Sequence, residues 1–183
     1  MVRIPITINN RGVTLIELIV ALGLSSIVLT LVLGIFFTGT KLYKYVNDSM
    51  EIQQQGHFIM DFITTKVMPS SEIDTITGHN NASYYNKSEE IELKEIELID
   101  DILEKQEKHI FSIQEDEKVE GKSIRYGKSK IAKVELGNYI KKAYASPLPK
   151  GCIYKDADGI ALTIEMQKGD ASLKVFKSIY FRK

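Results

Sequence analysis

The sequence predicts an α+β protein in which one long N-terminal helix packs on a small antiparallel β-sheet. A run without any charged residue extends from Leu18 to Thr40, and a helical apolar pattern continues from there to Pro69. The last third of the 183-residue chain instead alternates apolar and polar residues between short turn motifs. The first pattern is typical of helices and the second of β-hairpins.

The apolar run is long enough to cross a membrane. A helix rises about 1.5 Å per residue, and a bilayer core of roughly 30 Å needs about 20 apolar residues. Leu18 to Phe37 supplies that length, so we expect a transmembrane or assembly helix over residues 13–40. The small residues in this run either allow close helix packing or are simply tolerated. They are Gly23, Ser25, Ser26, Thr30, Gly34 and Gly39.

An acidic residue, Glu17, stands at the start of the apolar run. Placing a carboxylate in a membrane costs about 2.5–3.5 kcal/mol on translocon-based scales, so such residues are candidates for a functional role. A partner for the Glu17 carboxylate is therefore expected.

A short polar leader ends in Gly, and Glu follows four residues later inside the apolar helix. The residues that form this pattern are Arg11, Gly12, Thr14, Leu15, Ile16, Glu17 and Leu18. The pattern resembles the prepilin signature of type IV pilins, minor pilins and the pseudopilins of type II secretion and competence systems. It covers about the first third of the chain. Val13 stands where the family usually has Phe, and the apolar segment lacks the Pro that major pilins often carry. These departures favour a minor over a major subunit.

The resemblance implies processing and assembly. Residues 1–12 would be a leader, cut by a prepilin peptidase between Gly12 and Val13, and the new Val13 amine would be methylated. Thr14 and Glu17 would serve assembly, with Glu17 pairing to the N-terminus of a neighbouring subunit. The alternatives are a pair within one chain and a protonated Glu17.

The resemblance also implies partners and location. The partners would be other pilin subunits, the peptidase, the pilus or secretion machinery and the membrane. The chain would first span the inner or cytoplasmic membrane once, with its leader cytoplasmic and its C-terminal domain outside, and then enter a cell-surface filament. Arg3 and Arg11 favour a cytoplasmic leader, whereas Lys41 and Lys44 weaken that preference. The alternative is a permanently anchored single-span protein whose outer domain binds a ligand or partner.

Beyond the apolar run, residues 41–68 predict an amphipathic continuation of the helix, ended by Pro69 and with a possible kink at Gly56. Residues 69–183 predict the globular β domain. We expect a surface loop over Tyr139–Pro149. The expected strands cover 73–76, 90–99, 109–114, 123–126, 130–135, 160–167 and 172–181, and Lys177 indicates an edge or a bulge in the last strand.

Composition adds few functional clues. The 24 basic and 24 acidic residues cancel, so the chain carries no nucleic-acid signal. Cys152 is the only cysteine, which excludes an internal disulfide and leaves either a partly buried thiol or a bond between molecules. His57, His79 and His109 lack metal-ligand spacing and are expected at the surface or on a helix face. We therefore expect a structural protein, not an enzyme, without cofactor or metal.

Overall fold

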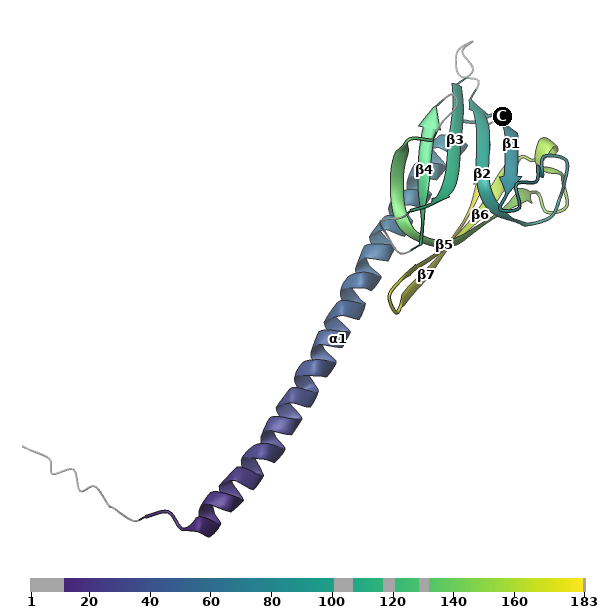
Figure 1. Cartoon of the computed structure of the whole chain (residues 1–183). Coiled ribbons are helices and arrows are strands. Elements are labelled where there is room, and N and C mark those ends of the chain that lie inside the picture. The colour runs from purple at the N-terminus through teal and green to yellow at the C-terminus, as the bar shows by residue number, and fades with distance from the viewer. Residues whose placement is uncertain (1–11, 101–106, 117–120, 129–131, 183) are drawn as a thin grey trace, which may run out of the picture. The chain divides into compact units, whose positions relative to one another are not determined.

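The computed structural model describes residues 12–100, 107–116, 121–128 and 132–182 (Figure 1). The chain divides into two compact units, Met1–Lys44 and Tyr45–Lys183. Helix α1 (Leu15–Val67) contributes to both units. The predicted continuous helix is thus confirmed, and it ends at Val67, just before Pro69.

In the first unit, α1 is apolar and exposed. All of its residues from Leu15 to Lys44 are exposed, and most of them are Leu, Ile, Val or Phe. Its hydroxyl groups bond to the helix's own carbonyl oxygens. Thr30 Oγ1 donates to the Ser26 oxygen at 2.8 Å, and Thr38 Oγ1 donates to the Gly34 oxygen at 2.9 Å. These internal bonds remove the need for water, which suits an apolar environment.

In the second unit, the described residues form one antiparallel sheet of seven strands in the order β1 to β7. The strands are β1 (Glu72–Gly78), β2 (Ile91–Asp100), β3 (Glu107–Glu115), β4 (Lys122–Lys128), β5 (Val134–Leu148), β6 (Gly159–Lys168) and β7 (Ala171–Tyr180). A 3₁₀-helix, η1 (Tyr154–Asp156), lies between β5 and β6. β2 also pairs with β5, so the sheet folds back on itself. The predicted α+β class with an antiparallel sheet is confirmed.

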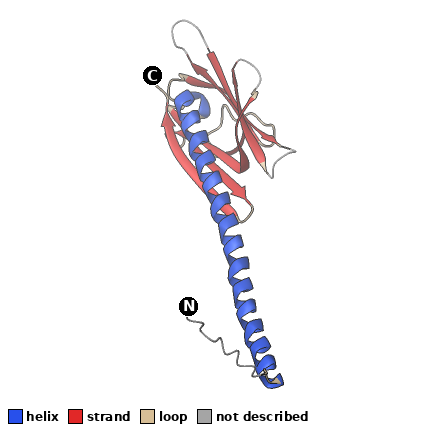
Figure 2. Ribbon diagram, turned by 90° about the vertical axis from the view of Figure 1, so that its left-hand side faces the viewer, coloured by secondary structure: helices blue, strands red, loops and turns tan. Residues whose placement is uncertain are grey.

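The second half of α1 lies on one face of this sheet (Figure 2). Ile52, Ile59, Ile63 and Val67 recur at helical spacing and are buried against the strands. Burying one such side chain contributes about 1.5–3 kcal/mol, so this stripe fixes the helix on the sheet.

Gly56 allows close packing of α1, and the helix continues through it without interruption. A Cβ atom at Gly56 would lie 2.9 Å from Leu173 Cδ2 and 3.2 Å from Val175 Cγ2, both on β7. The absence of a side chain therefore serves the contact between α1 and β7.

The prediction of a surface loop over Tyr139–Pro149 is wrong, because β5 runs through most of it. Of the strand expected at 130–135, residues 130–131 lie outside the described residues, 132–133 are not in a strand, and 134–135 begin β5. The start of β5 contacts α1. A Cβ atom at Gly137 would lie 2.7 Å from Ile59 Cδ1, and the Asn138 N–H donates to Gln55 Oε1 at 2.9 Å. Gly137 and Asn138 therefore allow the helix to lie close to β5.

The other expected strands are found. Those at 90–99, 109–114, 123–126, 160–167 and 172–181 correspond to β2, β3, β4, β6 and β7, and the short one at 73–76 lies within β1. The edge position that Lys177 indicated is confirmed, since β7 ends the strand order. Lys177 Nζ lies 3.0 Å from Asp61 Oδ1 on α1, which gives its charge a partner on the helix-facing side.

Candidate processing and assembly site

Thr14 and Glu17 cap the start of α1 reciprocally. The Thr14 N–H and hydroxyl donate to Glu17 Oε2 at 2.9 and 2.8 Å, and the Glu17 N–H donates to Thr14 Oγ1 at 3.4 Å. This arrangement is a capping box, in which two otherwise unpaired backbone N–H groups at a helix start gain acceptors. In the unprocessed chain the Glu17 carboxylate thus has a local partner, and it also lies at the positive end of the helix dipole.

The expected cleavage point, between Gly12 and Val13, is exposed. Gly12 and Val13 precede the helix, and Val13 is 73% exposed. A Cβ atom at Gly12 would meet no other atom within 4 Å. Within the described part of the chain, no contact therefore requires glycine at this position. The predicted leader, apart from Gly12, lies outside the described residues.

The helix that follows needs an apolar partner. Its large side chains are all at least 45% exposed through Phe37, among them Leu24 at 61% and Leu31 at 63%. Within the described residues, α1 is also the one helix long and apolar enough to cross a membrane. So large an apolar surface in water is unusual for a soluble monomer and marks a membrane or protein contact.

The comparison with family models agrees with this geometry. A model described as the prokaryotic N-terminal methylation motif matches residues 8–33, a range that includes Gly12, Val13, Thr14 and Glu17. Neither the curated proteins nor the solved structures contain a match to the chain. Together with the long apolar helix, the motif fits a type IV prepilin-like protein, of the pilin or pseudopilin kind. It implies assembly with other pilins and association with a membrane.

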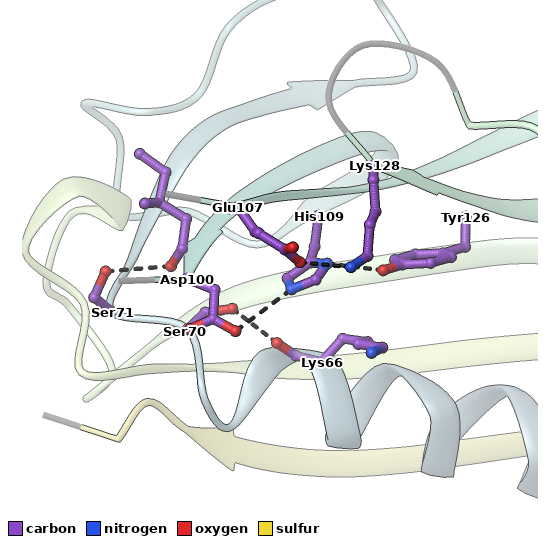
Figure 3. A network of polar contacts seen from close by, with 9 residues as sticks. Lys66, Ser70, Ser71, Asp100, Glu107, His109, Tyr126 and Lys128 are labelled. Atoms are coloured by element: carbon purple, nitrogen blue, oxygen red, sulfur yellow. Dashed lines mark hydrogen bonds and ion pairs between the residues drawn. The ribbon is translucent and has the colours of Figure 1, made fainter. Parts of the chain in front are cut away.

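A second polar cluster lies inside the sheet domain (Figure 3). His109 on β3 is only 2% exposed, so its expected surface position is wrong. Its Nδ1 lies 2.8 Å from the Tyr126 hydroxyl, and its Nε2 lies 3.5 Å from Asp100 Oδ2. These two partners make burial of the ring tolerable. Burial lowers the pKa of His109, and the neighbouring Asp100 carboxylate opposes this effect in part.

The other candidate ligands stand apart. His57 and His79 are exposed, on α1 and after β1 respectively. Among the residues that the structure describes, no three His, Cys, Asp or Glu side chains come close enough to hold a metal ion. Cys152 is half-buried, and burial raises the pKa of its thiol. A protonated thiol is a weak nucleophile, which favours a packing role for Cys152.

Proposed function

We propose that this protein is a subunit of a type IV pilus or pseudopilus, and specifically a minor pilin. A prepilin peptidase cuts between Gly12 and Val13, and the freed Val13 amine is methylated. The subunit then leaves the membrane and enters a filament through its N-terminal helix. The observation that carries this proposal is the methylation motif at residues 8–33, together with an apolar helix whose large side chains are exposed through Phe37.

Glu17 has a defined role in this proposal. Cleavage creates a cation at Val13, beside the positive end of the helix dipole, where a positive charge is unfavourable. The Glu17 carboxylate of an adjacent subunit neutralises that amine, so two charges that are costly in an apolar bundle compensate each other. This pairing sets the axial register between subunits.

The proposal divides the chain as the sequence suggests. Residues 1–12 are the leader, 13–40 the membrane and assembly helix, 41–68 its amphipathic continuation and 69–183 the globular domain. The leader faces the cytoplasm and the globular domain faces outward before assembly.

Mass spectrometry of the protein isolated from its own cells tests the proposal. We expect an N-terminal peptide that begins at Val13 and carries one additional methyl group. The Gly12→Val variant should keep Met1, because the added side chain blocks the approach of the peptidase to the backbone. Gly34→Val is the matched control, since a Cβ atom at Gly34 also meets nothing within 4 Å. A chain that keeps Met1 in cells with assembled filaments would instead be a permanently anchored protein.

A further inference from the structure

The sheet has an outward face that α1 does not cover. Side chains alternate between the two faces of a strand. On β7, Leu173 and Val175 face α1 at Gly56. Phe176 and Ser178 occupy the alternate positions of the strand and therefore face away from the helix. The burial pattern agrees, because the even-numbered residues from Ser172 to Tyr180 are exposed while the odd-numbered ones are partly or fully buried.

A row of small residues crosses three strands on this outward face. Ser146 of β5 pairs with Ala161 of β6, and Ala161 pairs with Ser178 of β7. Ala161 is only 7% exposed, although it lies on the face away from the helix. The three residues of this row line a groove of about 340 Å³. That volume falls within the range of about 300–1,000 Å³ found for small-molecule sites.

The walls of the groove combine an aromatic ring with unpaired charges. Phe176 lines it and is 63% exposed, although it is held on a regular strand. Glu90 and Lys150 also line it, and both are exposed. Within the described residues neither forms an ion pair, with each other or with any other group. The groove thus offers a flat apolar surface, hydroxyl groups, one acceptor charge and one donor charge.

We propose that this groove is a carbohydrate-binding site. A pyranose ring has a face of C–H bonds and a rim of hydroxyl groups. The C–H face carries partial positive charge and suits the negative face of the Phe176 ring. Hydroxyl groups both donate and accept, so a neutral sugar satisfies Glu90 and Lys150 together.

The direction of the groove argues against an added peptide strand. A peptide that extends a sheet runs along its edge strand and places alternate side chains in pockets. The row Ser146–Ala161–Ser178 instead crosses the strands from β5 to β7. This inference goes beyond the proposed assembly role and does not depend on N-terminal processing.

The test uses the full chain in a detergent without a sugar headgroup, because a glycosidic detergent would compete for the groove. The probes are the tetrasaccharides cellotetraose, chitotetraose and maltotetraose, measured by saturation-transfer NMR and calorimetry. We expect at least one of them to bind. Phe176→Ala should weaken binding on the order of three- to ten-fold, the value of an aromatic contact. Ser178→Phe should abolish binding by filling the groove.

Phe58→Ala is the matched control, because Phe58 is 55% exposed on α1 and does not line the groove. It should bind as the wild-type chain does. The proposal is overturned if none of the three tetrasaccharides binds at millimolar concentration. It is also overturned if binding is the same in the Phe176 and Ser178 variants, or if the groove takes up a protein and no saccharide.

Discussion

The hydroxyl group of Tyr154 donates a hydrogen bond of 2.6 Å to the carbonyl oxygen of Ala145. Tyr154 belongs to η1 and is fully buried, whereas Ala145 lies on β5 at the point where β2 also pairs with that strand. The carbonyl oxygen of Glu89 lies 3.2 Å from the same hydroxyl. Burial raises the pKa of Tyr154 far above its usual range, so the group stays a donor at all physiological pH values. The bond ties the β5–β6 connection to the place where the sheet folds back on itself.

Tyr154→Phe should therefore lower the free energy of unfolding by about 1–2 kcal/mol, because the buried carbonyl oxygen of Ala145 loses this donor. Denaturant unfolding of the full chain in detergent, followed by near-UV circular dichroism, measures the loss. Tyr180→Phe is the control, since Tyr180 is 59% exposed. Equal stability of the two variants would show that the buried hydroxyl adds nothing.

An ion pair holds the β6–β7 hairpin to α1 in the second unit. Lys168 Nζ lies 2.5 Å from Glu51 Oε2 and 3.3 Å from Asp48 Oδ1, and Asp48 is only 7% exposed. The bond to Glu51 is the main reason that the pKa of Lys168 is raised. Lys168→Met should cost about 1–3 kcal/mol of unfolding free energy, because Asp48 stays buried without its partner.

Lys174→Met provides the comparison for this second prediction. Lys174 is exposed and pairs with Glu165 on the neighbouring strand at 2.9 Å. Pairs of this kind add little to stability, so its loss should leave the unfolding curve unchanged. If both lysine variants unfold at the same denaturant concentration as the wild-type chain, the Lys168 contact does not hold the hairpin to the helix.

Local patterns predicted most of the fold. The apolar run and Pro69 defined α1, and alternation around Gly169 defined the β6–β7 hairpin. Most of β5 was missed. Gly137 and Asn138 near its start have low strand propensity, and their contacts depend on a helix about 80 residues earlier in the sequence. Residues chosen for a tertiary contact of that kind carry no local signal.

Only part of the candidate site could be predicted from the sequence. Gly12, Val13 and Glu17 stand in one short motif, so the sequence alone is enough to propose them as processing and assembly residues. The capping box was not predicted, although the Thr-x-x-Glu spacing of Thr14 and Glu17 is its sequence signal. The partners of His109 lie on other strands, and no spacing in the sequence indicates them.

His109 should make stability depend on pH. Its pKa is lowered in the folded state, mainly by burial, with Lys66 and Lys128 adding to the effect and Asp100 opposing it. The unfolded chain therefore binds a proton more readily. The stabilising effect of the neutral ring is complete above about pH 6.5 and is lost as the pH falls below that value. The free energy of unfolding can change by up to about 1.4 kcal/mol per pH unit in the range where unfolding takes up one proton.

Denaturant unfolding between pH 5 and 8 checks this dependence. His109→Gln should flatten the pH profile in this range, because the amide does not titrate. His57→Gln, at an exposed position on α1, should keep the slope of the wild-type chain. A wild-type profile that is as flat as that of His109→Gln would contradict the role assigned to the buried ring.

Glu17 serves two possible purposes, and substitution can separate them. Its carboxylate accepts hydrogen bonds from Thr14, and by our proposal it also neutralises the amine of a neighbouring subunit. Loss of the cap alone costs about 1 kcal/mol of helix stability. Glu17→Gln keeps an oxygen that can accept the Thr14 bonds but removes the charge, whereas Thr14→Val removes the hydroxyl and keeps the charge.

We expect both variants, and Glu17→Ala, to be cleaved normally, since Gly12 and Val13 are unchanged. Glu17→Gln and Glu17→Ala should remain in the membrane, because each leaves the neighbouring Val13 amine without a counter-charge. Thr14→Val should enter filaments, with at most a modest loss. Immunoblots of sheared filaments and of membranes measure how much of each variant lies in the two fractions. If Glu17→Gln assembled as well as the wild-type chain while Thr14→Val did not, the helix cap rather than the charge pair would govern incorporation.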